Sequence, residues 1–282
     1  MSIGPNRQNK PLGDQHIVWS AGYHAWRQQQ KRMALWVWII RGTLLAGILV
    51  LWQVAADAQW VNPLLISSPL AVASTAVHLW SSGGLMPDFF LTFQETILSV
   101  VISLALGMGG AVVIWWNPLL ERITDPFLTV LNALPKIALG PIFFIWLGDH
   151  LSIYGMAISI SVIVTLLMLS GGFRQTEAAH TTLMRSLGAG KRHILMMVVI
   201  PDNIPNLVAT TKVNLSLNMV GVIAGEFLAS KAGLGYLILY GSQVFQMSQV
   251  MVGIVAMGIM AAILYASVSW VGQRLMLRYH FV

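Results

Sequence analysis

Six apolar runs, each about 20 residues long, constrain this chain more than any other feature of its sequence. They lie near residues 35–57, 92–115, 127–147, 151–171, 204–227 and 248–270. An α-helix rises about 1.5 Å per residue, so about 20 residues cross the roughly 30 Å of hydrocarbon in a bilayer. Because lipid cannot satisfy backbone hydrogen bonds, each run is expected to be helical. The prediction is an all-α, polytopic membrane protein with six transmembrane helices.

The composition supports this prediction. Only 9% of the residues are charged and 56% are hydrophobic, whereas a soluble domain has about 25% charged residues. The surface is therefore expected to face membrane lipid. The sequence "LGDH" alone separates the third and fourth runs, which predicts an antiparallel hairpin. Residues 1–34 are polar and do not resemble a cleaved signal peptide, so they are expected to form a cytoplasmic tail before a membrane domain of residues 35–282.

The distribution of Lys and Arg predicts the orientation. With both termini in the cytoplasm, thirteen basic residues fall inside: Arg7, Lys10, Arg27, Lys31, Arg32, Arg41, Arg122, Arg174, Arg185, Lys191, Arg192, Arg274 and Arg278. Lys231 falls outside, while Lys136 and Lys212 lie within spans. Cytoplasmic loops of membrane proteins carry such an excess of positive charge. The net charge of +6 is therefore interpreted as a topology signal and not as a nucleic-acid footprint.

A polar stretch of residues 172–203 then lies in the cytoplasm between the fourth and fifth spans. Its apolar and basic residues alternate at helical spacing, which predicts a helix around 182–197. One interpretation is an amphipathic helix on anionic headgroups, and the other is a docking helix for a soluble partner. Gly188 would cost about 1 kcal/mol in mid-helix, so we expect a bend or a close approach there.

The spacing of Gly188, Val198, Ile200 and Pro201 resembles the cytoplasmic EAA loop of bacterial ABC importer permeases. The family's Glu-Ala-Ala position is occupied by residues 182–184, Thr-Leu-Met, and the literal Glu177-Ala-Ala lies five residues too early. The resemblance implies contact with an ATPase subunit through Thr182, Leu183, Arg185, Ser186, Leu187, Gly188, Ala189, Lys191, Arg192 and Pro201.

Three further segments are similar to the nitrate, sulfonate and taurine branch of these permeases. They are "NPLLISSPLAV" at 62–72, "ALPKIALGPIFFIWLG" at 133–148 and "GVIAGEFLASKAGLGYLI" at 221–238. The chain departs from that branch at three positions. Glu95 and Lys212 each replace an expected Arg, and Met219 replaces an expected Trp.

The resemblance implies a type I ABC importer permease fold with a cytoplasmic coupling helix, in a bacterial inner membrane. Two copies of the chain would form the pathway, two ATPase subunits would dock beneath it, and an external solute-binding protein would deliver the substrate. The chain has no G-x4-G-K-[ST] motif, so ATP and Mg are expected on the ATPase partner and no cofactor on this chain. It would then be a permease and not an enzyme.

Polar residues within the spans are functional candidates, because a buried charge costs several kcal/mol unless it is paired or hydrated. The candidates for the translocation pathway are Asn132, Lys136, Lys212, Asn214, Asn218 and Glu226. The alternatives are snorkelling or internal pairing for the charged residues and helix packing for the asparagines. The seven His residues lack ligand spacing and there is no Cys, which speaks against a metal site.

The expected substrate is a small solute. It is either an anion such as nitrate, taurine or an alkanesulfonate, or a heterocyclic vitamin precursor. An autonomous six-span carrier or membrane enzyme is the alternative function. The absence of a repeat, a buried carboxylate relay and a clustered catalytic set disfavours it.

Overall fold

The computed structural model describes residues 21–60, 62, 66–176 and 178–279. It divides into two units, Met1–Ala55 and Ala56–Val282. The first unit holds most of helix α1 (Ala21–Asp57), whose part Leu35–Asp57 is apolar and long enough to cross a membrane. This segment coincides with the first predicted span. The predicted tail falls largely on residues 1–20, outside the described residues.

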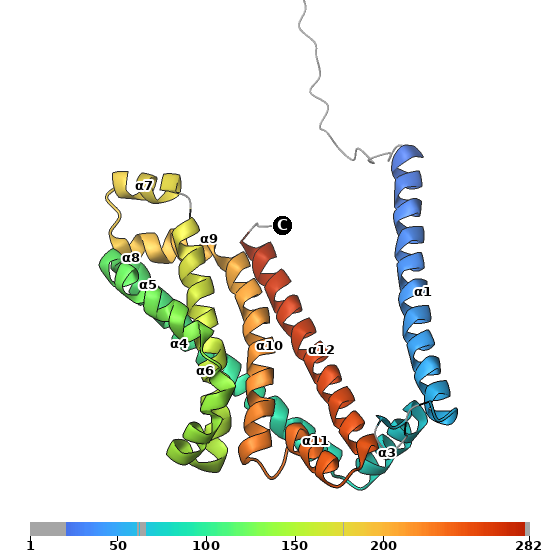
Figure 1. Cartoon of the computed structure of the whole chain (residues 1–282). Coiled ribbons are helices and arrows are strands. Elements are labelled where there is room, and N and C mark those ends of the chain that lie inside the picture. Colours follow the sequence, from blue (N-terminus) through green and yellow to red (C-terminus); the bar gives the residue numbers. More distant parts are fainter. Residues whose placement is uncertain (1–20, 61, 63–65, 177, 280–282) are drawn as a thin grey trace, which may run out of the picture. The chain divides into compact units, whose positions relative to one another are not determined.

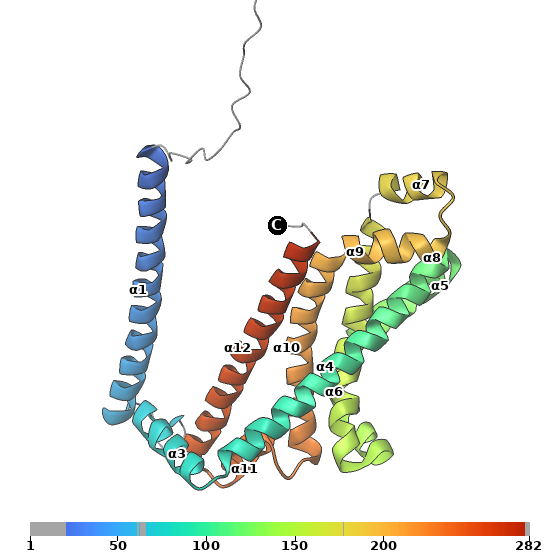
Figure 2. The same ribbon diagram turned by 180° about the vertical axis from the view of Figure 1, so that it is seen from behind.

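The second unit is a bundle of long helices. Its main members are α4 (Leu85–Trp116), α6 (Gly140–Gln175), α10 (Ile204–Ala229) and α12 (Met247–Arg278). Figures 1 and 2 show α4 crossing obliquely past α6 and α10. The short helices α3 (Pro69–Ser81) and α11 (Leu234–Gln243) pack against the beginning of α12. The helical nature of the second, fourth, fifth and sixth predicted spans is thereby confirmed.

The predicted third span is wrong as a continuous helix. Residues 127–133 belong to α5 (Pro118–Ala133), which ends at Leu134 with extended φ of −65° and ψ of 137°. A residue before proline avoids the helical region, and Pro135 itself has no N–H group to continue a helix. A 3₁₀ turn η1 (Lys136–Leu139) leads into α6. By length and composition, five helical segments of the described residues, instead of six, can cross a membrane, and one of them is Lys136–Gln175.

The predicted tight turn within "LGDH" is present at Gly148. This glycine has a φ of 75° and interrupts the helical path of α6. A Cβ atom added to Gly155 would lie 2.7 Å from Cδ1 of Leu147 and 3.1 Å from Cδ1 of Phe143. The short arm before Gly148 therefore folds back beside the arm that follows, as the lower end of α6 shows in Figure 1.

Two glycines bring α10 against α6. A Cβ atom at Gly225 would lie 2.8 Å from Cα of Ile153, and one at Gly221 would clash with the backbone of Ala157. Gly221 and Gly225 are spaced as G-x-x-x-G, a pattern that allows two membrane helices to approach through their backbones. This contact positions the polar face of α10 inside the bundle.

Candidate functional site

The 172–203 loop is built from short helical pieces, so the single helix predicted for 182–197 is wrong. Helix α7 (Ala178–Ser186) comes first, followed by α8 (Lys191–Ile194), a π-helical segment η2 (Leu195–Val199) and α9 (Ile200–Asp202). In Figure 1, α7 lies above α8 and α9, which run across the end of the bundle. Glu177, the literal Glu of the motif, lies outside the described residues.

Gly188 ends helix α7 and does not lie within it. Its φ is +80°, the amide of Ala189 donates a 2.9 Å hydrogen bond to the carbonyl of Met184, and the amide of Gly188 donates a 2.9 Å bond to Arg185. These two bonds define a Schellman motif, in which glycine takes the left-handed position just past a helix. No heavy atom of the described residues lies within 4 Å of a Cβ built at Gly188. Within this chain, the glycine therefore serves the turn and not a close contact.

An apolar cluster anchors the loop to the bundle. Ile194, Leu195 and Val199 are buried against Ala111 of α4 and against Leu169 and Phe173 of α6. Met184 and Ala189, the two ends of the Schellman turn, pack against the same cluster. Burial of apolar side chains of this size contributes roughly 1.5–3 kcal/mol each. The loop is therefore fixed to the ends of α4 and α6.

The residues predicted to contact an ATPase are mostly on the outer surface of this anchored loop. Leu183 is 60% exposed and Leu187 is 74% exposed. The other exposed members are Thr182, Arg185, Ser186, Gly188, Lys191 and Arg192, while Ala189 and Pro201 are half-buried. The surface thus offers apolar side chains among basic groups, a combination suited to either a protein surface or anionic headgroups.

Two asparagines that the sequence analysis missed close the base of the loop. The Nδ2 group of Asn203 donates to the carbonyl of Val199 at 2.8 Å and to Oγ1 of Thr176 at 2.9 Å, and Asn206 Nδ2 donates to the carbonyl of Met168 at 3.1 Å. They join the end of α6 to the start of α10 beside a hollow of about 520 Å³. The sequence "DNIPN" signals a helix start, but not this cross-link.

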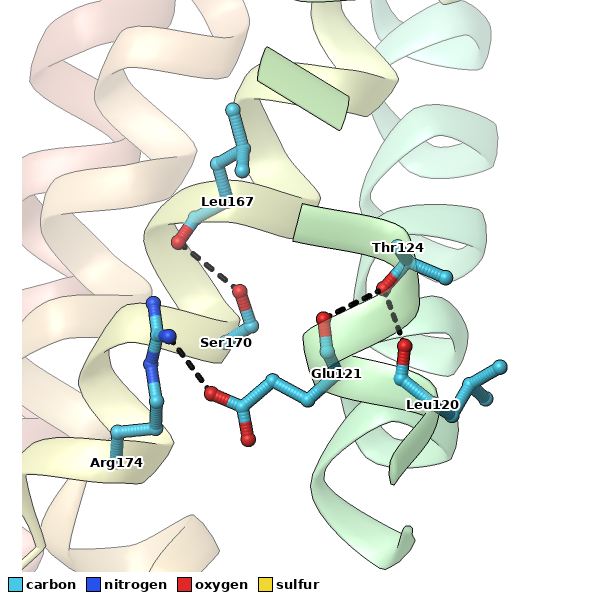
Figure 3. A network of polar contacts seen from close by, with 6 residues as sticks. All are labelled: Leu120, Glu121, Thr124, Leu167, Ser170 and Arg174. Atoms are coloured by element: carbon cyan, nitrogen blue, oxygen red, sulfur yellow. Dashed lines mark hydrogen bonds and ion pairs between the residues drawn. The ribbon is translucent and has the colours of Figure 1, made fainter. Parts of the chain in front are cut away.

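An ion pair lies at the same end of the bundle. Arg174 of α6 and Glu121 of α5 are 2.7 Å apart, and Figure 3 shows the two side chains facing one another. Thr124, also in that view, donates to the carbonyls of Leu120 and Glu121 in its own helix. Because the Arg174 side chain is half-exposed, the pair contributes little to stability. It is a contact that joins α5 to α6.

The structure separates the six pathway candidates into two groups. Asn214, Asn218 and Glu226 are at most 1% exposed and face α4 and α6 of the same chain. Asn214 Nδ2 donates to Oγ1 of Thr165 at 2.6 Å and to Oγ of Ser103 at 3.0 Å. Asn218 Nδ2 donates to Oδ1 of Asn214 at 2.7 Å. Their placement favours the helix-packing alternative over a place on the pathway wall.

The other three candidates are near the surface of the unit. Lys136 Nζ lies 3.2 Å from the carbonyl of Asn132, at the end of α5, and 3.4 Å from its Oδ1. The ammonium group of Lys212 lies 4.8 Å from the ring centroid of Tyr265 on α12. Such a cation–π contact partly replaces the water that a lysine loses within a span. Both lysines keep an accessible side and can attract an anion.

Residues 102–280 match the family model described as a binding-protein-dependent transport system inner membrane component. The chain is 26% identical to the formylaminopyrimidine transport permease protein ThiX of Halalkalibacterium halodurans, over 67% of this chain and 75% of that protein. It is 22% identical to the taurine transport system permease protein TauC of Escherichia coli, over 83% and 87% respectively.

A solved structure shares the fold. A chain of the MetNI methionine ABC transporter in an inward-facing conformation matches with a TM-score of 0.59 and 15% identity, over 69% of this chain and 95% of that one. Its likeness shows the fold, and the family match covers well over half of this chain. The chain therefore belongs to the binding-protein-dependent transport system inner membrane components, as the permease subunit of an ATP-driven ABC importer.

Proposed function

We propose that two copies of this chain form one pathway for a small anionic solute, with two ATPase subunits bound to their 172–203 loops. An external binding protein delivers the solute, both termini lie in the cytoplasm, and ATP and Mg are held by the ATPase partner. The anchored loop with exposed leucines is the observation that carries this proposal.

The loop has the two properties that mechanical coupling needs. On its outer side, Leu183 and Leu187 together expose an apolar area among basic groups, which a protein groove would cover. On its inner side, Ile194, Leu195 and Val199 are packed against α4 and α6, so a displacement of the loop moves these helices as well. ATP-driven closure of the partner subunits would thereby change which side of the membrane the pathway opens to.

Helix α5 supports a second copy. None of its residues is buried in the described structure, and Ile123, Phe127 and Val130 are all more than half exposed. Its opposite face carries Asp125 and Asn132, which are ill suited to lipid. A symmetric partner would bury this helix and place the adjoining Lys136 beside the shared pathway.

The anionic substrate is supported by Lys136 and Lys212 and by the taurine and sulfonate permeases among the relatives. The ThiX relative favours a second candidate, a pyrimidine-type vitamin precursor. Binding measurements on the cognate external binding protein, with taurine, an alkanesulfonate, nitrate and an aminopyrimidine, separate the two. Tight binding of the aminopyrimidine alone would contradict the anionic substrate.

A matched pair of variants tests the ATPase contact. Gly188→Ala and Gly188→Trp suffer the same left-handed strain, but only the tryptophan adds bulk on the exposed side of the turn. We expect Gly188→Trp to lose ATPase association and ATP-driven uptake in proteoliposomes, while Gly188→Ala retains association. Equal association and uptake for both variants would contradict an ATPase contact at Gly188.

A further inference from the structure

A polar face of α4 meets the end of α10 and the loop before α11. Asp88, Thr92 and Glu95 follow one another at helical spacing on α4, and Glu226 of α10 faces them. Thr92, Glu95 and Glu226 are buried. This group is separate from the 172–203 loop and from the accessible lysines.

Glu226 is the centre of a hydrogen-bond network. The hydroxyl of Thr92 donates to its Oε1 at 2.6 Å, and the amide of Gly235 donates to its Oε2 at 2.5 Å. The amide of Leu234 donates to Oγ1 of Thr92 at 2.8 Å. Both oxygens of Glu226 thus accept a hydrogen bond, which stabilises an ionised carboxylate.

The end of the loop and the first turn of α11 can approach these acids because Gly233 and Gly235 have no side chains. The amide of Gly233 donates to Oδ1 of Asp88 at 2.8 Å, with a φ of +102° that other residues rarely adopt. A Cβ atom at Gly235 would lie 2.6 Å from Oε2 of Glu226. The two glycines of "GLGY" therefore let the backbone serve as the donor to both carboxylates.

Glu95 differs from Glu226 in its surroundings. It is only 3% exposed, and its Oε2 has no hydrogen-bond partner among the described residues. It lies one helical turn after Thr92, which contacts Glu226 directly, and the two carboxyl groups are near enough to interact electrostatically. Two ionised carboxylates side by side in an apolar bundle would repel one another strongly. One of the two must therefore be neutral.

The neighbouring elements supply no cation to this pair. Asp88 on α4 and Tyr154 on α6 interact with it electrostatically, and Tyr236 follows directly after Gly235 on α11. The half of α12 beside α11, residues 247–263, contains no titratable side chain. Lys231 in the loop is exposed and, in the described structure, forms no ion pair with the carboxylates.

We propose that Glu95 holds a proton and donates it in a hydrogen bond to ionised Glu226. This single proton joins α4 to α10, and Glu226 in turn holds residues 230–235 through the amide of Gly235. Glu226 is the ionised partner because Thr92 and Gly235 already donate to it. Glu95 is the protonated partner because no donor among the described residues reaches its Oε2.

Glutamine substitutions distinguish the two carboxyl groups. Glu95→Gln supplies a neutral N–H donor in place of the protonated acid, so the hydrogen bond from residue 95 to Glu226 should survive. Glu226→Gln puts an NH₂ group against either Thr92 or the amide of Gly235, where an acceptor is needed. In the full complex in lipid nanodiscs, Glu95→Gln should keep the wild-type Tm in mildly acidic buffer, while Glu226→Gln should lose several degrees.

The pH dependence of the Tm gives a second, independent readout. A group that binds more protons folded than unfolded stabilises less as the pH rises. The wild-type Tm should therefore fall towards alkaline pH, and Glu95→Gln should flatten this fall. Asp149→Asn, which neutralises an exposed carboxyl group, should follow the wild type.

Infrared spectroscopy identifies the proton itself. The wild type should show the carbonyl stretch of a buried protonated carboxylic acid, and Glu95→Gln should lack it. A Glu95→Gln Tm as low as that of Glu226→Gln, or a protonated-acid band that persists in Glu95→Gln, would overturn the assignment. A wild-type Tm that depends on Na⁺ and not on pH would assign the site to a cation instead.

Discussion

The hydroxyl group of Thr92 on α4 donates a 2.6 Å hydrogen bond to Oε1 of Glu226 on α10, across 134 positions of sequence. The same hydroxyl accepts a hydrogen bond from the amide of Leu234. One small side chain therefore connects two membrane helices and the start of α11. Its removal takes this partner away from Oε1 of Glu226 and from the amide of Leu234 inside the bundle.

Thr92→Val should lower the free energy of unfolding by about 1–3 kcal/mol, because both buried groups lose a partner while the shape of the side chain stays the same. Thr92→Ser, which keeps the hydroxyl, should be milder. Thr129→Val is the control, since its exposed hydroxyl bonds only to the carbonyl of Asp125 in its own helix. Thermal unfolding in detergent measures all three, and an equal loss for Thr92→Val and Thr129→Val would contradict the role of Thr92.

Gly188→Ala should destabilise the 172–203 loop by about 1–2 kcal/mol, the cost of an L-residue in the left-handed conformation. Gly190→Ala is a matched control two residues away. Gly190 has a φ of −73°, and a Cβ there also meets nothing within 4 Å. Hydrogen exchange of α7 and α8 should therefore speed up in Gly188→Ala and not in Gly190→Ala. The same protection in both variants would disprove the Schellman turn.

Asn214→Ala should destabilise the protein by roughly 1–2 kcal/mol, because Ser103 and Thr165 lose their shared partner inside the bundle. Ser216→Ala, on the exposed side of the same helix, should be neutral. The amount of folded protein and its Tm report this difference. A changed KM for transport at an unchanged Tm would instead place Asn214 on the pathway.

Gly221→Ala should separate α10 from α6, because the new methyl group meets the backbone of Ala157 and backbone cannot rotate away. We expect a loss of about 1–3 kcal/mol. Gly258→Ala on α12 is the control, since a Cβ there meets no atom of the described structure within 4 Å. That variant should be neutral or slightly more stable, as alanine favours helix. Identical Tm values for the two variants would contradict the close approach.

Lys136→Ala should weaken uptake of an anionic solute more than Lys212→Ala does. Lys136 lies just beyond the C-terminal end of α5, where its ammonium group contacts the carbonyl of Asn132, whereas Lys212 is held over the ring of Tyr265. Initial rates of ATP-driven uptake in proteoliposomes measure this difference as an increase in KM. Normal uptake by both variants, with only a lower Tm, would make the lysines structural.

Much of the architecture could be predicted because hydropathy alone decides which segments enter a membrane. The failures have local causes. The third run of apolar residues continues through Pro135, and hydropathy does not register the missing N–H group or the extended Leu134. A glycine can either end a helix or bend it, and the sequence alone does not give the sign of the φ angle of Gly188. The predicted helix therefore runs through a residue that lies just past the end of α7.

The candidate site was harder to predict because polarity does not indicate which way a side chain faces. Asn214 and Glu226 are polar residues in a span, and the sequence allows either a pathway or a helix contact for them. Only the packing of α10 on α4 and α6 distinguishes these alternatives. The partners Thr92 and Ser103 look like ordinary small residues of an apolar run, and they become informative only beside Asn214 and Glu226.

The polar contacts shared by α4, α6 and α10 also determine an order of events during biosynthesis. The chain is made from its N-terminus, so Ser103 and Thr165 enter the membrane before Asn214 has been added. Before then, hydrogen bonds within their own helices remain available, as from Thr165 to the carbonyl of Ser161. A nascent chain that stops after α6 therefore lacks the side chain that joins these two hydroxyls, and the addition of α10 completes the polar contacts of the bundle.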